Sequence, residues 1–134
     1  MSEAAAATVR AYVEALNAFD LERLRALFAP HARIYGVLGF GGLEEVAPIW
    51  RELHEGMAMH LEILSLIAAD GQVAVRYRET GRFVGPFRGL AGHAPTGRPY
   101  EVVAMEWFEL NTDGITARWG ARDFSAISRQ VLGG

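Results

Sequence analysis

The chain has 134 residues, of which 51% are hydrophobic and 22% charged, and a formal net charge of −3. This length and composition predict one globular domain, residues 1–134, whose hydrophobic core needs no disulfide. The sequence contains neither cysteine nor lysine. Their absence excludes thiolate metal sites, cysteine nucleophiles, a Walker-type phosphate loop and Schiff-base chemistry. The negative charge gives no electrostatic support for a nucleic-acid partner.

The sequence shows no targeting or membrane signal. Its N-terminus lacks the basic start and apolar centre of a signal peptide. No apolar run reaches the roughly eighteen residues that a membrane span needs. We therefore expect a cytoplasmic protein without a membrane partner.

The first half of the sequence has the periodicity of helices. Apolar residues recur at the spacing of amphipathic helices in three segments, residues 9–16, 21–28 and 46–57. Asp20 is the expected N-cap of the second helix. Residues 32–38 predict a strand, which a glycine-rich turn at residues 39–42 connects to the third helix.

The second half alternates with the period of β-strands. Four strands are expected, at residues 60–69, 73–82, 100–110 and 115–124. Both sets of alternating positions in the first of them are largely apolar, which predicts a strand covered on both faces. Glycines and prolines in residues 85–99 predict a long loop. A short terminal helix is expected to close at Gly133.

Helices followed by a meander of strands indicate an α+β fold rather than a doubly wound sheet. We expect a curved antiparallel sheet that wraps around the N-terminal helices as a cone with one open end. The apolar interior of such a cone suits a small apolar molecule.

The last strand carries the first candidate catalytic residue, Asp123. Strict alternation places Asp123 on the same face as Ile115 and Trp119, and Arg118 on the opposite face. An aspartate at the end of an apolar face is expected to lie in desolvated surroundings that suit proton transfer. The alternative is that Asp123 lies past the sheet edge and caps the terminal helix.

Glu106 is the second candidate catalytic residue. Both faces of its strand, residues 100–110, are largely apolar, so we expect this strand to be central and Glu106 to be buried. A buried carboxylate needs a partner or a proton. Glu106 either forms a structural ion pair with an arginine or shares a pocket with Asp123. In the shared pocket the two carboxyl groups would divide the roles of acid and base.

The histidines and glycines do not form a metal or nucleotide motif. His54-Glu55 resembles the start of the zinc motif HExxH, but the next histidine, His60, is two positions too late. The glycines at residues 39–42 resemble a dinucleotide loop, but Glu44 stands where that loop needs its third glycine. We therefore expect neither a metal nor a dinucleotide at these residues.

The aromatic residues have two possible roles. Trp50, Phe108 and Trp119 either fill the core or form the walls of a pocket for an apolar ligand. Tyr35 is a further candidate for contact with such a ligand. His60 is another such candidate if it lies at the mouth of the cone, although a place on the surface is the alternative.

A loop and the strand after it carry a resemblance to a known family. Residues 92–102, with the sequence GHAPTGRPYEV, resemble the Pro-Thr-Gly-Arg/Lys loop of the SnoaL-like polyketide cyclases, a branch of the nuclear transport factor 2-like superfamily. The resemblance extends to residues 81–89, 105–108 and 113–115 and to the motif Trp119-x-x-x-Asp123.

This resemblance implies a cone-shaped α+β barrel, related also to the cystatin-like folds and commonly a homodimer packed through its sheet. It implies cofactor-free chemistry on a small apolar or polyketide-like substrate, with Asp123 as the general acid/base of an aldol-type ring closure. Ala117 and residues 120–122 depart from the family's pattern and leave the reaction open. Epoxide hydrolysis, ketosteroid-type isomerisation and a non-catalytic binding or dimerisation module are the alternatives.

Overall fold

A computed structural model describes residues 2–133, which form four α-helices, six strands and one short 3₁₀ turn, η1. In chain order the elements are α1 (Ser2–Ala18), α2 (Leu21–Leu27), β1 (Phe28–Gly36), β2 (Gly39–Gly41), α3 (Leu43–Met57), β3 (His60–Ala69), β4 (Gln72–Arg82), η1 (Arg88–Leu90), β5 (Pro99–Asn111), β6 (Gly114–Arg122) and α4 (Phe124–Leu132).

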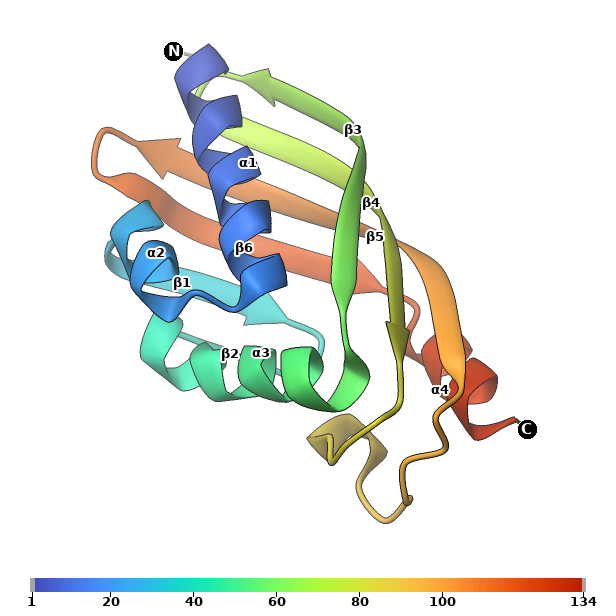
Figure 1. The fold of residues 1–134 in the computed structure, drawn as a ribbon. Coiled ribbons are helices and arrows are strands. Elements are labelled where there is room, and N and C mark those ends of the chain that lie inside the picture. Colours follow the sequence, from blue (N-terminus) through green and yellow to red (C-terminus); the bar gives the residue numbers. More distant parts are fainter. Residues whose placement is uncertain (1, 134) are drawn as a thin grey trace.

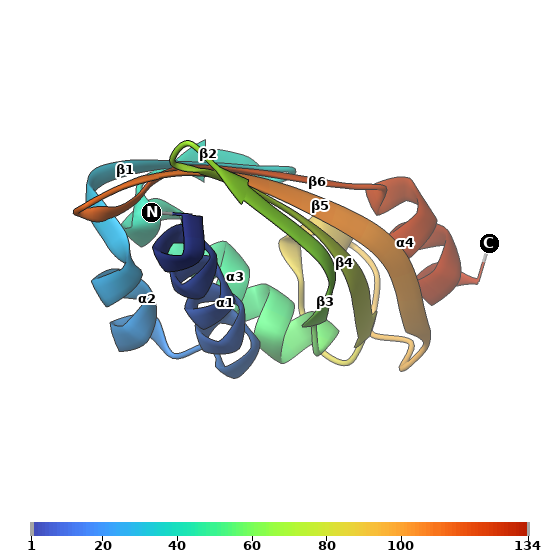
Figure 2. The same ribbon diagram turned by 90° about the horizontal axis from the view of Figure 1, so that it is seen from above.

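The six strands form one curved sheet in the order β2-β1-β6-β5-β4-β3. Neighbouring strands are antiparallel except β1 and β6, which run parallel. The sheet is thus mixed rather than purely antiparallel, because the meander from β3 to β6 brings its last strand beside β1. Figures 1 and 2 show α1, α2 and α3 on the concave side of the sheet and α4 beside the end of β6. The expected α+β architecture is confirmed.

The helices form where the apolar periodicity predicts them. The stripe of α1 is buried against the sheet, with Val9 and Tyr12 fully inaccessible to solvent. Asp20 caps α2 as expected, since its carboxylate accepts a hydrogen bond of 3.2 Å from the backbone N–H of Arg23. Within residues 2–133, no helix is both long and apolar enough to span a membrane.

Two expectations about the strands need correction. The first strand, expected at residues 32–38, begins at Phe28, because the chain passes from α2 directly into β1. β3 is an edge strand and is not covered on both faces, since only one face packs against α1. Leu64 and Ile67 on β3 are accordingly 44% and 68% exposed. The long loop at residues 85–99 is confirmed and contains only the turn η1.

A β-bulge in β6 decides which of its side chains face the helices. Ile115 pairs with Leu110 of β5, and Ala117 pairs with the neighbouring Glu109. Thr116, between them on β6, is therefore an extra residue without a partner on β5. Ile115, before the bulge, is buried in the core beneath the sheet. Beyond the bulge the large buried side chain is that of Arg118. The alternation expected for this strand is therefore inverted from Arg118 onward.

The outer face of the sheet, away from α1–α3, exposes large apolar side chains. Met105, Trp107 and Trp119 on the adjacent strands β5 and β6 are 56%, 46% and 39% exposed. Trp119 stacks on Tyr35 with 5.4 Å between the ring centres, and Tyr35 stacks on Phe40 at 5.9 Å. An exposed apolar patch of this kind commonly marks an interaction surface.

Candidate active site

A cavity of about 40 Å³ lies between the inner face of the sheet, α3 and the start of α4. Much of its wall is apolar and includes Trp50 and Met57. The charged side chains among its described lining residues are Glu79, Arg118 and Arg122. The cavity is small, and the protein's own side chains therefore fill most of the cone.

Glu79 is a fully buried carboxylate in the wall of this cavity. Arg122 Nε donates a hydrogen bond of 2.6 Å to its Oε1, and Tyr100 Oη donates one of 2.7 Å to its Oε2. Arg122 projects from β6 and Glu79 from β4, with β5 between them. The β5 residue opposite Arg122 is the small Ala104, which leaves room for the arginine to reach across.

Glu106 forms a second buried cluster on the same face of the sheet. Its Oε2 forms an ion pair with Arg118 Nη2 and accepts a hydrogen bond of 3.3 Å from Tyr12 Oη. Its Oε1 accepts one of 2.8 Å from Tyr77 Oη. The predicted burial of Glu106 is thus confirmed. Of the two partners considered for it, the structure has the arginine and not Asp123.

Arg118 connects the second cluster to the cavity. Its Nη1 donates a hydrogen bond of 3.2 Å to the Tyr35 carbonyl oxygen, and its guanidinium lies 5.6 Å from the centre of the Trp50 ring. Gly120 provides the space for this guanidinium, since a Cβ atom there would lie 2.7 Å from Arg118 Nη2. Arg118 Nε is the one buried side-chain nitrogen or oxygen of residues 2–133 that lacks a hydrogen-bond partner.

Burial keeps the three tyrosines of these clusters protonated. It is the largest cause that raises the pKa of Tyr12, Tyr77 and Tyr100 above the usual value of 10.0. The negative charge of Glu106 raises the pKa of Tyr12 and Tyr77 further, and that of Glu79 does so for Tyr100. At neutral pH these phenols are therefore hydrogen-bond donors.

The two buried arginines are charged. Burial opposes the charged form of Arg118, but Glu106 outweighs it, so the pKa of Arg118 lies above its ordinary value. Burial and the positive charge of Arg118 both oppose protonation of Arg122. Glu79 and Glu106 outweigh them and raise the pKa of Arg122 as well.

Asp123 lies outside the cavity, and the expectation that it is buried on an apolar face is wrong. Asp123 is exposed, and its carboxylate accepts a hydrogen bond of 2.9 Å from the backbone N–H of Ala126. Asp123 is thus the N-cap of α4, which was the alternative interpretation. The physical reason is twofold: the bulge at Thr116 inverts the faces of β6, and the strand ends at Arg122.

The residues expected to bind substrate lie in different parts of the fold. Trp50 lines the cavity as expected. Phe108 is buried in the core, where its ring lies 5.0 Å from that of Tyr12. The prediction that Trp119 and Tyr35 line the cavity is wrong, because their stacked rings lie on the outer face with Trp119 39% exposed.

His60 does not line the cavity either; it is exposed at the start of β3, as the surface alternative had it. Sequence reasoning also missed Glu79, Tyr100 and Arg122. A signal for Glu79 was present, since it continues the alternation of the buried residues Val73, Val75 and Tyr77 along β4. No such local signal marks Arg122, whose side of the strand depends on the bulge.

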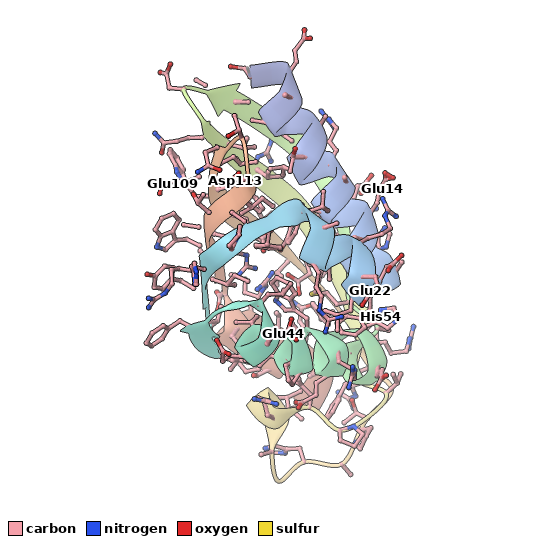
Figure 3. All side chains as sticks on the ribbon, turned by 90° about the vertical axis from the view of Figure 1, so that its left-hand side faces the viewer. Glu14, Glu22, Glu44, His54, Glu109 and Asp113 are labelled. Atoms are coloured by element: carbon pink, nitrogen blue, oxygen red, sulfur yellow. The ribbon has the colours of Figure 1, made fainter. Side chains whose placement is uncertain are left out.

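Other titratable side chains lie away from the cavity. Figure 3 shows Glu14, Glu22 and His54 on the helices and Glu109 and Asp113 at the opposite side of the molecule, toward the β5–β6 hairpin. Among residues 2–133, no group of three or more histidine, aspartate or glutamate side chains is arranged to hold a metal ion.

The Glu106–Arg118 pair predicts a non-additive effect on stability. Arg118→Met leaves a buried carboxylate without its counter-charge and should lower the free energy of unfolding by about 3–5 kcal/mol. The double variant Glu106→Gln/Arg118→Met removes both charges and should recover a large part of this loss. Arg78→Met, at an exposed ion pair, is the control and should cost less than about 1 kcal/mol. Urea denaturation measures all three, and equal losses in the single and double variants would contradict the account.

The buried tyrosines predict a loss of stability at alkaline pH. Above about pH 10 the unfolded chain releases phenolic protons that Tyr12, Tyr77 and Tyr100 retain in the fold, because their pKa is raised there. The free energy of unfolding should therefore fall by about 1.4 kcal/mol per pH unit for each tyrosine. Denaturation at several pH values measures this slope. Tyr77→Phe should reduce it by about a third, and an unchanged slope would contradict the prediction.

Solved structures share this fold at low sequence identity. AclR, a candidate hydroxylase from Streptomyces galilaeus, has a TM-score of 0.85 at 18% identity, covering 100% of this chain and 84% of its own. IdmH, a candidate polyketide cyclase from Streptomyces antibioticus, has a TM-score of 0.83 at 26% identity, with 96% and 98% covered. A candidate polyketide cyclase from Xanthomonas campestris has a TM-score of 0.84 at 21% identity, with 97% and 98% covered.

These similarities confirm the nuclear transport factor 2-like fold and relate the chain distantly to candidate polyketide cyclases and a candidate hydroxylase. The comparison with curated protein sequences found no match. The sequence pattern of the SnoaL-like domain matches residues 9–126, so the chain belongs to the SnoaL-like domain family.

Proposed function

We propose that the protein is a cofactor-independent enzyme that transfers protons at a small carbonyl compound, with aldol-type ring closure as its reaction. The observation that carries this proposal is the environment of Glu79. This carboxylate is inaccessible to solvent and lies in the wall of a largely apolar cavity, next to a neutral phenol and a guanidinium. A positioned carboxylate and a positioned donor are what general acid–base catalysis requires.

In the proposed reaction, Glu79 removes a proton from the carbon next to a carbonyl group, and the electron pair of the broken C–H bond forms the enolate. When substrate binds, Tyr100 turns its one hydroxyl hydrogen from Glu79 Oε2 to the carbonyl oxygen, which frees Oε2 to act as the base. That carbonyl oxygen becomes the negatively charged oxygen of the enolate. The enolate carbon then forms a bond to a second carbonyl carbon of the same molecule. The oxygen of that second group takes up the proton that Glu79 carries. The ring-closed product is an isomer of the substrate, so the step consumes no other reactant.

Two further side chains support these roles. Arg122 fixes the orientation of Glu79 through its bond to Oε1 and is a positioning residue. Trp50 provides part of the apolar wall. Because the cavity is small, we infer that the substrate is compact. Isomerisation of the ketosteroid type begins with the same removal of a hydrogen and therefore belongs to the same proposal.

The family resemblance assigns the acid/base role to Asp123, whereas the proposal assigns it to Glu79. Matched amide variants distinguish the two. Glu79→Gln removes the proposed base with little change in volume. Asp123→Asn removes the other carboxylate and keeps the cap of α4, since asparagine is an equally good N-cap residue.

The test uses 2,5-hexanedione, a small diketone, in D₂O. Proton NMR measures the exchange of its α-hydrogens for deuterium and the formation of the ring-closed aldol. We expect Glu79→Gln to reduce the enzyme-dependent exchange at least about 100-fold. We expect Asp123→Asn to retain the rate of the natural sequence.

The opposite pattern, with exchange lost in Asp123→Asn and retained in Glu79→Gln, would show that the family's aspartate is the base. Exchange that none of the proteins accelerates would favour the non-catalytic binding module.

We also propose that two copies of the chain pair through the outer face of the sheet. Met105, Trp107 and Trp119 form its exposed apolar centre. Side chains of both signs, including Arg76 on β4 and Glu109 on β5, are exposed beside this centre. A face that carries both charges can complement itself across a two-fold axis.

Light scattering on a sizing column tests this pairing. The natural sequence should have the mass of two 14.7 kDa chains, and Trp107→Glu should have the mass of one. Val84→Glu places the same charge at an exposed apolar residue in the loop after β4 and should leave the dimer intact. A single-chain mass for the natural sequence would refute the proposal.

A further inference from the structure

Arg118 has a hydrogen-bond donor that the folded chain does not use. The residue is only 2% exposed and lines the cavity. Two of its nitrogens are engaged, Nη1 by the carbonyl oxygen of Tyr35 and Nη2 by Glu106. Nε has no partner within residues 2–133. Buried donors without a partner are rare, because they lose their bonds to water and gain nothing. An acceptor oxygen of a ligand in the cavity would satisfy this donor.

The charges around the cavity indicate that this oxygen belongs to an uncharged molecule. Glu106 pairs with Arg118 and Glu79 with Arg122, and all four side chains are at most 10% exposed. Two negative and two positive charges sum to zero. A bound carboxylate would add a buried negative charge without a counter-charge, which is unfavourable in a desolvated site. A carbonyl oxygen accepts the same hydrogen bond and leaves the balance unchanged.

The side chain that carries the unused donor lines the same cavity as the proposed reacting groups. The guanidinium of Arg118 lies over Gly120, as the short distance to a Cβ atom there shows. Gly120 is two residues from Arg122, which corresponds to about 6–7 Å along a strand. Arg122 in turn contacts Glu79. A compact molecule with two oxygens can therefore reach both Arg118 and the Glu79–Tyr100 pair.

We propose that Arg118 Nε binds a neutral carbonyl oxygen of the ligand, so that the cavity selects uncharged dicarbonyl compounds over keto acids. One carbonyl is held at Arg118 and the other at Tyr100. This inference names the substrate class of the same cavity, so its catalytic meaning rests on the proposed function. Binding itself is tested without turnover.

The experiment compares 2,5-hexanedione with levulinate, which carries a carboxylate oxygen in place of one methyl group of the diketone. ¹H–¹⁵N spectra of the arginine Nε–H groups report on binding, with the Arg118 signal identified by its loss in Arg118→Lys. The diketone should shift this signal. Its dissociation constant should be at least about tenfold lower than that of levulinate.

Arg118→Lys keeps a positive charge beside Glu106 but has no nitrogen equivalent to Nε. We expect it to weaken binding of the diketone at least about tenfold. Arg78→Lys, the same substitution at an exposed ion pair, is the matched control and should leave binding unchanged. If Arg118→Lys does not fold, Gly120→Ala provides a second variant, because its Cβ displaces the guanidinium without removing the charge.

Three results would overturn the inference: levulinate binding as tightly as the diketone, diketone binding that leaves the Arg118 signal unmoved, or no binding of either compound. Its failure is distinguishable from that of the proposed function. A shifted Arg118 signal without Glu79-dependent exchange supports the binding site and refutes the catalysis. Glu79-dependent exchange together with full diketone affinity in Arg118→Lys supports the catalysis and refutes the binding site at Arg118.

Discussion

The ion pair between Glu106 and Arg118, buried at the middle of the sheet, is the interaction on which the rest of the structure depends. Either charge alone would be strongly destabilising there. Tyr12 from α1 and Tyr77 from β4 complete the hydrogen bonds of the carboxylate, so the pair connects the first helix to three strands. It also holds the Arg118 guanidinium over Gly120 and thereby sets the wall of the cavity.

Stability alone is a weak reason for two buried ion pairs. Apolar side chains of similar volume commonly replace such pairs without loss of stability. Here both pairs adjoin one cavity, and buried charged groups in a cavity are a common feature of functional sites. The Glu79–Arg122 pair supplies the proposed base and its orientation, whereas Glu106–Arg118 supplies a donor and a neutral electrostatic balance. A small neutral carbonyl compound fits both parts.

Local patterns predicted most elements of this fold, and pairing between distant strands explains the errors. The stripe of α1 and the cap Asp20 depend on residues a few positions apart, which the sequence displays directly. The bulge at Thr116 depends on how β6 meets β5, and nothing within β6 indicates it. It buries Arg118 and leaves Asp123 outside the cavity, so the predicted site was wrong in its main residue. The burial of Glu79, by contrast, could have been predicted from the alternation along β4.

The inward direction of the two arginines of β6 is the central claim, and hydrogen–deuterium exchange at their Nε–H groups, followed by NMR, tests it most directly. The account predicts that Arg118 and Arg122 exchange at least about 100-fold more slowly than Arg78, because their side chains are 2% and 10% exposed and that of Arg78 is 49% exposed. Exchange of all three at the same rate would place the two guanidiniums in solvent. That result would contradict the inverted strand and the site built on it.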